Sequence, residues 1–415
     1  MKKLLNFGIF TIFVFLLLLY NVEFENKYAY ALETSSNTSK SLRLDIKAEK
    51  KVNLTPSPTI AVTPTQTPTP TSTATATVTP SPTLTPTPTV MPTPTTTPFQ
   101  IPNKIKLGFT TKYNNDDFSS YNSLNANPDL VNLISVFTYQ TDGSGNITGT
   151  NAPEQVNYAN NNNIIPLALV TNSLGSGFSQ AVATELLSSA SNRQTFITNL
   201  IFVIKQNGYK GVNIDFEDIP YILRNNYTAF IEQLKTALSN ENLITSVCVA
   251  AKCIDYPTNA WNGAFDYYAI GQVADFVVIM TYDEHGPWSN SGAIASYNWV
   301  NSVINYAVTV IPKEKIVMGL ASYGYEWSSA GNKAYSLTQI DNIISQNNIT
   351  PIFDNVSKSP YFTYTTNEIL KTVWYENYQS ITLKINIARN YEIKGIALWR
   401  LGLENSAIID AINTY

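Results

Sequence analysis

Eight short apolar segments separated by longer amphipathic stretches limit what this chain can fold into. Some, such as residues 276–280, are apolar at every position, as expected for parallel strands covered on both faces. Helical spacing fills the stretches between them, for example at Phe196, Leu200 and Ile204, where Gly208 then marks a helix end. The alternation predicts an α/β fold, and eight units favour a (β/α)8 (TIM) barrel over a doubly wound sheet. The expected strands are residues 104–110, 132–138, 164–170, 211–217, 243–250, 275–282, 315–321 and 394–400.

The stretch between the last two expected strands is too long for a single crossover helix. It runs from residue 322 to residue 393. We therefore place a small α+β insertion at about residues 325–374, between strands seven and eight of the barrel. The barrel with its insertion is expected to occupy residues 101–415.

The first residues have the features of an export signal. Lys2 and Lys3 precede an apolar run that reaches Tyr20, and Ala29-Tyr30-Ala31 supplies small residues at the spacing that a signal peptidase reads. We expect a signal peptide at residues 1–31, and hence a secreted, cell-surface or cell-wall protein. An uncleaved membrane anchor is the competing interpretation, although the run is slightly short for a span.

A long segment after the signal cannot form a hydrophobic core. Residues 55–98 are almost entirely Thr, Pro, Ser, Ala and Val, with no aromatic or charged residue. Such a segment favours extended polyproline II, so residues 55–100 are interpreted as a linker and residues 32–54 as a short N-terminal segment. The linker either spaces the barrel from a cell-wall or membrane attachment, as a bare or glycosylated stalk, or is a solvated tail without a partner.

Charge and cysteine usage exclude several classes of function. The net charge is −4 and 13% of residues are charged, so nothing basic indicates a nucleic-acid partner. Cys248 and Cys253 are expected to be free, buried thiols, and with a single histidine they are too few for a zinc site. We expect no metal, no cofactor and a monomer.

Carboxylates on the fourth expected strand are the strongest functional signal. Successive side chains of a strand point to opposite faces, so Asn213, Asp215 and Glu217 should point into the barrel, where apolar residues normally pack. Burying two carboxylates is costly, and folding alone gives no reason for it. Glu217 is last, at the carboxyl end where barrel enzymes carry their chemistry, and its crowded site should raise its pKa as a general acid requires. Asp215 lies one pleat deeper on the same side of a bound sugar, which poorly suits attack from the opposite face.

This strand resembles the signature of glycoside hydrolase family 18, the chitinase family, written D-G-x-D-x-D-x-E. Its form here, GVNIDFE, is similar to the branch that hydrolyses spore-cortex and cell-wall peptidoglycan. The resemblance covers about residues 104–415 and returns at four other strand ends: SVFTYQTDGSGNITG, NGAFDYYAIGQVADFVVIMTYDEHGPW, KIVMGLASYGYEW and GIALWRLGLE.

The resemblance implies hydrolysis of β-1,4 bonds at N-acetylglucosamine with help from the substrate. Glu217 would protonate the leaving oxygen and later activate water, while the acetamido oxygen of the sugar attacks the anomeric carbon with net retention. Asp215 would hold the acetamido N–H and offset positive charge, and Tyr282 would bond the acetamido oxygen. Trp399 would form the floor under the reacting sugar. Asp283, Tyr325 and Trp327 match positions that line the cleft.

The chain departs from the family signature at two positions. Lys210 and Asn213 stand where the first two aspartates usually are. Lys210 lies at the amino end of the strand, away from the chemistry. Asn213 is common in the peptidoglycan-directed branch and removes a proton partner from beneath Asp215, so it favours peptidoglycan over chitin as substrate.

Four interpretations of function follow. The first is an N-acetylglucosaminidase acting on peptidoglycan, the second a chitinase, and the third a chitinase-like carbohydrate-binding protein without turnover, which the retained Glu217 disfavours. The fourth is a surface-displayed adhesion or matrix protein that uses the barrel as a scaffold, and only the linker supports it. Tryptophans outside the strand ends add little. Trp299 and Trp374 are expected to anchor the core or loops, whereas Trp261 and Trp288 are also candidates for platforms that stack on sugars.

Overall fold

The computed structural model describes residues 100–175 and 177–415. The predicted signal peptide, the N-terminal segment and all of the linker except Gln100 lie outside these residues. Within the described part, eight parallel strands close into a barrel, because β2 pairs with β1 and β1 with β16. The predicted (β/α)8 barrel is confirmed. Its strands are β1 (Ile105–Thr111), β2 (Leu133–Thr141), β4 (Ile165–Thr171), β7 (Gly211–Asp215), β8 (Ile244–Ala250), β9 (Phe276–Met280), β10 (Ile316–Ala321) and β16 (Gly395–Trp399).

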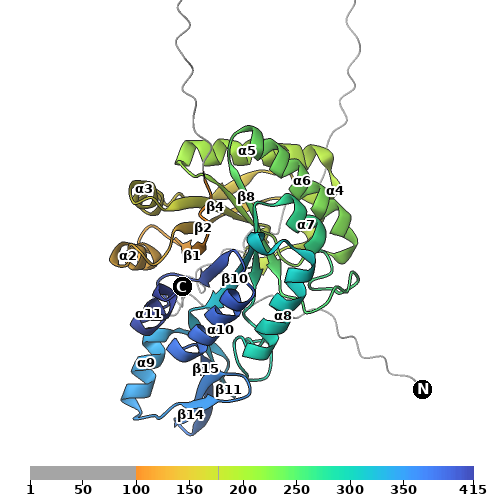
Figure 1. Cartoon of the computed structure of the whole chain (residues 1–415). Helices are drawn as coiled ribbons and strands as arrows, with labels where there is room; N and C mark the ends of the chain where they lie inside the picture. The colour runs from red at the N-terminus through yellow and green to blue at the C-terminus, as the bar shows by residue number, and fades with distance from the viewer. Residues whose placement is uncertain (1–99, 176) are drawn as a thin grey trace, which may run out of the picture. The chain divides into compact units, whose positions relative to one another are not determined.

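Helices cover the outside of this barrel (Figure 1). Gly208 ends α5 in the left-handed region at φ 77°, and its N–H bonds to Ile204 O, as the sequence predicts. No helix among the described residues is long and apolar enough to cross a membrane. The helices are α2 (Ser119–Ala126), α3 (Pro153–Asn161), α4 (Gln180–Ser188), α5 (Ala190–Asn207), α6 (Arg224–Asn240), α7 (Tyr267–Val273), α8 (Tyr297–Val310), α10 (Tyr378–Asn390) and α11 (Ser406–Asn413), with short 3₁₀ turns at Tyr221–Leu223 and Lys313–Lys315.

The barrel has two apolar clusters, one between strands and helices and one inside the barrel. Val212, Ile214 and Phe216 belong to the outer cluster. The inner cluster contains residues from the other barrel strands, such as Leu107 and Val278, but among the described residues none from β7. β7 therefore presents polar side chains where its neighbours present apolar ones, as the alternation predicts.

A small α+β insertion lies between β10 and β16, within two residues of the predicted bounds. Its antiparallel sheet has the order β12-β11-β15-β14-β13. Tyr375 belongs to the helix-facing cluster together with Ile340 of α9. On the other face, Tyr325 joins the cluster inside the barrel, so this face of the insertion borders the barrel mouth. The elements are β11 (Tyr323–Ser328), β12 (Lys333–Ser336), α9 (Leu337–Gln346), β13 (Ile352–Asp354), β14 (Ser359–Thr366) and β15 (Ile369–Tyr375).

The short strands outside the barrel and the insertion form hairpins at strand ends. β3 (Ile147–Gly149) pairs antiparallel with the end of β2, around a turn at residues 142–145. β5 (Ser173–Leu174) and β6 (Gly177–Phe178) pair just after β4. These hairpins extend the carboxyl-terminal rim of the barrel beyond the closed sheet.

The two cysteines are free, as predicted, but they differ in exposure. Cys248 is buried on β8, whereas Cys253 is exposed. The expectation that both are buried is wrong for Cys253, because β8 ends at Ala250 and the chain has by then entered a surface loop.

Candidate active site

Polar side chains of β7 point into the barrel and contact two other strands. Asn213 is fully buried; it donates to Ser135 Oγ on β2 at 3.1 Å, and its Oδ1 accepts from the thiol of Cys248 on β8 at 3.5 Å. The first contact reaches past β4 to β2, and the second joins β7 to its neighbour β8. Asn213 therefore ties β7 to two other strands without adding a charge beneath Asp215.

Asp215 is a buried carboxylate with an oxygen that has no hydrogen-bond partner. Its side chain is 4% exposed, and Oδ1 is buried and unpartnered. Burial raises the pKa of Asp215 to about 7, against a hydrogen bond with Cys248 that lowers it. An unpartnered buried oxygen costs free energy, and an N–H group that bonded to it would remove that cost.

Glu217 lies two residues beyond the end of β7 and is 7% exposed. Burial raises its pKa well above the usual range, and the charges of Asp215, Asp283 and Asp218 raise it further. A raised pKa favours the protonated form of the carboxyl group, which is the form that a general acid needs.

The backbone of Glu217 is held by Asn172, a residue that the sequence analysis missed. Asn172 Oδ1 accepts the N–H of Glu217 at 2.9 Å, and its Nδ2 donates to the carbonyl oxygen of Glu217 at 2.8 Å. Next along the chain, Asp218 has φ 52° and accepts from Gln180 at 2.8 Å. The position of Asn172 just after β4 was the available signal, because the ends of parallel strands lie at the same edge of the barrel.

Asp283 is half-buried beyond the end of β9 and is held by two tyrosines of the insertion. Its backbone has φ 61°, and Oδ1 accepts from Tyr323 at 2.5 Å and from Tyr325 at 2.9 Å. Burial raises the pKa of Asp283 to about 6, against both hydrogen bonds. Its Oδ2 is buried without a partner. Tyr325 is 1% exposed and its hydroxyl bonds to Asp283. Tyr323 was missed, although strand alternation places it on the same face as Tyr325.

Tyr282 stands against β10 at a position where only glycine leaves room for its ring. A β-carbon on Gly319 would lie 2.7 Å from Cε1 of Tyr282 and 2.8 Å from Ile279 O. Tyr282 is 7% exposed and belongs to the cluster inside the barrel. Burial raises the pKa of its phenol well above the usual range, so the hydroxyl keeps the proton with which it can donate a hydrogen bond.

Two tryptophans predicted for the site are well anchored. Trp399, at the end of β16, makes edge contacts with Phe109 and Phe137, with ring centroids 5.2 and 5.6 Å apart. Trp327 Nε1 donates to Gly286 O and Ser289 O, both at 3.1 Å. These contacts fix the two indoles before any ligand arrives.

The other tryptophans divide between anchors and exposed rings. Trp299 is partly buried against the outer cluster. Trp374 stacks on Tyr361 across the insertion sheet, at 4.5 Å between ring centroids. Both therefore act as the anchors that the sequence predicts, whereas Trp261 and Trp288 are 47% and 45% exposed.

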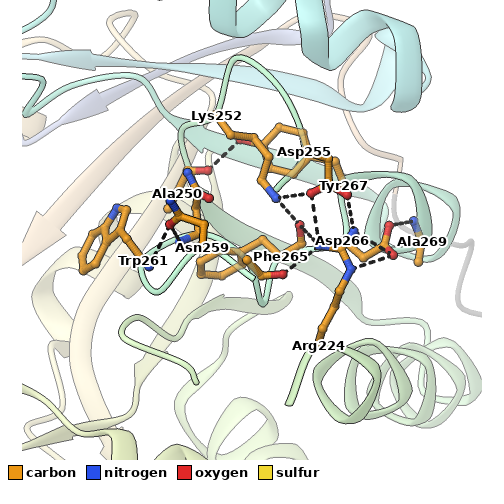
Figure 2. A network of polar contacts seen from close by, with 12 residues as sticks. Arg224, Ala250, Lys252, Asp255, Asn259, Trp261, Phe265, Asp266, Tyr267 and Ala269 are labelled. Carbon is orange, nitrogen blue, oxygen red and sulfur yellow. Dashed lines mark hydrogen bonds and ion pairs between the residues drawn. The ribbon is translucent and has the colours of Figure 1, made fainter. Parts of the chain in front are cut away.

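A second group of acidic residues lies in the loop after β8, where cations neutralise it (Figure 2). Arg224, the first residue of α6, donates to both carboxylate oxygens of Asp255 at 3.2 and 2.8 Å and lies 3.0 Å from Asp266. Lys252, only 1% exposed in its side chain, donates to Asp255 at 2.9 Å and to Phe265 O at 2.7 Å. We call Arg224, Lys252, Asp255 and Asp266 the loop network.

The carboxylates of the candidate site have no such cations. In residues 100–175 and 177–415, no ion pair joins Asp215, Glu217, Asp218 or Asp283 to a lysine or arginine. Nor does any group of His, Cys, Asp and Glu in the same residues have an arrangement that could hold a metal ion. The site can thus hold a protonated acid beside a carboxylate that stabilises positive charge, which is acid–base chemistry on an uncharged substrate.

A (β/α)8 barrel with buried carboxylates at the carboxyl end of one strand is an arrangement that fits a glycoside hydrolase. Residues 154–404 match the model of glycosyl hydrolases family 18. The chain belongs to this family and is a glycoside hydrolase.

The relatives and neighbouring structures include enzymes named for spore cortex and for chitin. The glycosylase YvbX of Bacillus subtilis is 33% identical over 74% of this chain and 90% of the relative, and the cortical fragment-lytic enzyme of the same organism is 30% identical over 67% and 66%. The spore cortex-lytic enzyme SleL of Bacillus megaterium superposes with a TM-score of 0.69 at 27% identity, covering 75% of each chain. A chitinase of Chromobacterium violaceum gives 0.69 at 27% identity, covering 75% of this chain and 98% of that one.

Proposed function

We propose that this glycoside hydrolase cleaves β-1,4 bonds at N-acetylglucosamine residues of peptidoglycan, with retention of configuration. The observation that carries the proposal is the buried, unpartnered Oδ1 of Asp215, the last residue of β7, two residues before the acid Glu217. Two carboxyls at the end of one strand approach a sugar from one side, so a nucleophile on the opposite side has to come from the substrate. An acetamido group supplies that oxygen, together with an N–H for Asp215.

The first step breaks the glycosidic bond. Glu217 gives its proton to the leaving oxygen, and the bond from that oxygen to the anomeric carbon breaks as the acetamido oxygen bonds to the same carbon. The oxazolinium ion that forms carries a positive charge. Ionised Asp215 accepts the acetamido N–H and stabilises this charge, while Tyr282 donates to the acetamido oxygen and Trp399 packs under the sugar.

The second step returns the enzyme to its starting state. Glu217, now a carboxylate, takes a proton from water, and the water oxygen bonds to the anomeric carbon as the oxazolinium ring opens. Two displacements at one carbon give net retention. Asn213, Asp283, Tyr325 and Trp327 hold the pocket in place around these groups.

Peptidoglycan is favoured over chitin by Asn213 in the signature and by relatives named for cortical fragments and spore cortex. Chitin is the second candidate substrate, favoured by the similarity to the Chromobacterium violaceum chitinase. Binding without turnover is disfavoured because Glu217 is retained with a raised pKa. We further propose that the protein is a secreted or cell-wall-associated monomer. Fractionation of cells, followed by light scattering of the purified protein, tests this.

Mass spectrometry of digestion products tests the substrate and the bond together. Purified peptidoglycan should release fragments with N-acetylglucosamine at the new reducing end, and chitin oligosaccharides should be cut more slowly. The reverse ranking would make the enzyme a chitinase. Chitosan that lacks the acetyl groups serves as the control, because equal cleavage of chitosan would exclude catalysis by the acetamido group.

A further inference from the structure

We infer that Asn172 is a positioning residue that holds the backbone of Glu217 where its carboxyl can act as the acid. The inference rests on the proposed role of Glu217. β4 and β7 pair through Thr171 and Asp215, and at this point β7 ends. Glu217 is the second residue beyond the paired strand, so the barrel ladder no longer fixes its backbone.

The side chain of Asn172 replaces the missing ladder partner. Its Oδ1 accepts the N–H of Glu217 at 2.9 Å, and its Nδ2 donates to the carbonyl of the same residue at 2.8 Å. A neighbouring strand would offer one acceptor and one donor in this way. Because both backbone groups of Glu217 are engaged, a rotation of the peptide that swings its side chain away has to break at least one buried hydrogen bond.

Asn172 is itself fixed in one orientation. It is fully buried, and its Nδ2 also donates to Ser179 O at 3.1 Å. The backbone carbonyl oxygen of Asn172 accepts from Ser179 N at 3.1 Å. Ser179 in turn caps α4 by accepting from Val182 N. An amide flipped by 180° would set its NH₂ against the N–H of Glu217 and its oxygen against two carbonyls, so only the observed orientation satisfies all the groups. The start of α4 therefore holds the backbone of Glu217 through the side-chain amide of Asn172.

Asparagine suits this position better than its ionisable analogue. Aspartate in its protonated form can still accept the N–H and donate to the carbonyl of Glu217. Ionised aspartate has no donor and adds a negative charge beside a carbonyl and near Glu217 and Asp218. The Asn172→Asp variant should therefore switch between a competent and an incompetent state as its own carboxyl titrates.

The test compares Asn172→Ala and Asn172→Asp with a matched variant at the other end of the barrel. Asn132 makes the same kind of bracket, with Oδ1 accepting from Lys106 N at 2.9 Å and Nδ2 donating to Lys104 O at 2.8 Å, but it is half-buried and lies at the amino end of the strands. Asn132→Ala should lower thermal stability and leave kcat per folded molecule unchanged.

Asn172→Ala should lower kcat about a hundredfold with little change in KM, since a displacement of about 1 Å costs this much. The kcat of Asn172→Asp, relative to wild type at each pH, should recover as the pH falls and drop as it rises. A pH-independent ratio for Asn172→Asp, a loss confined to KM, or an equal loss of kcat in Asn132→Ala would overturn the inference.

Hydrogen exchange separates this inference from the proposed function. Protection of the Glu217 amide should drop in Asn172→Ala and persist in Asn132→Ala, whether or not the protein turns over any substrate. If the amide stays protected in Asn172→Ala, the bracket does not hold Glu217. If it is lost while Glu217→Gln hydrolyses peptidoglycan like wild type, the bracket is real and the role of Glu217 is wrong.

Discussion

Two groups of acidic residues at the same end of the barrel differ in whether cations compensate their charge. In the loop network, burial would raise the pKa of Asp255, but hydrogen bonds and charge from Lys252 and Arg224 outweigh burial and lower it. In the site, burial raises the pKa of Asp215 and Glu217, and no cation opposes it in the described residues. The first arrangement stabilises a loop. The second raises the pKa of carboxyl groups at the expense of stability, as expected for groups that transfer protons.

This difference in charge compensation indicates which of the two groups is a functional site. Carboxylates occur in both groups and both are near the carboxyl ends of strands, so position alone does not separate them. Compensation of the charge by a cation does separate them, because a buried charge that serves only the fold is normally paired with an opposite charge. Variants that remove one charge from each group test this contrast.

The largest expected effect is on activity and comes from Glu217→Gln. The amide has nearly the shape of the protonated acid but cannot give a proton, so kcat should fall by about 10²–10⁴-fold. Thermal stability should stay equal or rise. The matched control is Asp255→Asn, which removes an acidic group from the loop network and should retain kcat. Hydrolysis by Glu217→Gln at the wild-type rate would end the assignment of the acid.

Asp215→Asn should reduce activity and increase stability at high pH. The amide cannot offset the positive charge of the oxazolinium ion, and we expect kcat to fall by about 10²-fold. The folded-state pKa of Asp215, about 7, lies above the unfolded value, so the wild type loses stability as the pH rises from about 4 to 7.

The asparagine variant escapes that loss of stability. Its free energy of unfolding relative to wild type should grow across this pH range by on the order of 2–4 kcal/mol. Urea denaturation at pH 4 and pH 8 measures the difference. A variant that is less stable than wild type at pH 8 would contradict the account of Asp215 as an uncompensated charge.

Asp255→Asn should have the opposite dependence on pH. It leaves Arg224 and buried Lys252 without their shared carboxylate, which should cost about 2–3 kcal/mol at pH 7. Because the folded pKa of Asp255 lies below its unfolded value, the stability it contributes is present above about pH 4 and is lost below it. The stability gap between variant and wild type should therefore close as the pH falls below 4. A gap that widens in acid would show that the loop network does not work through this charge.

Sequence periodicity was sufficient for the barrel, its eight strands and the insertion, because parallel strands and covering helices have distinct apolar spacing. It also placed Asn213 and Asp215 inside the barrel, since alternation along one strand is local geometry. The strand ends at Asp215, two residues earlier than predicted, and Glu217 is buried just beyond it. The contacts between segments could not be found in this way. Asn172 reaches Glu217 and Tyr323 reaches Asp283 across 45 and 40 residues of sequence, and such pairs depend on how loops turn after each strand.

The loop network illustrates the same limit, because Arg224 and Asp255 belong to different barrel units. The smallest expected effect tests its geometry, not its charge. Arg224→Lys keeps one positive charge but cannot donate to both oxygens of Asp255 and also reach Gly263 O, to which Arg224 now donates at 2.7 Å. We expect a loss of about 1–2 kcal/mol in unfolding free energy with kcat unchanged.

The KM of Arg224→Lys then separates two uses of the loop that this network holds. Trp261, 47% exposed, lies in the loop between Lys252 and Asp266. If that indole stacks on a sugar, loosening the loop should raise KM a few-fold, and Trp261→Ala should raise it equally without changing stability. If KM stays constant in both variants, the loop network serves stability alone, whereas the carboxylates without cations serve activity.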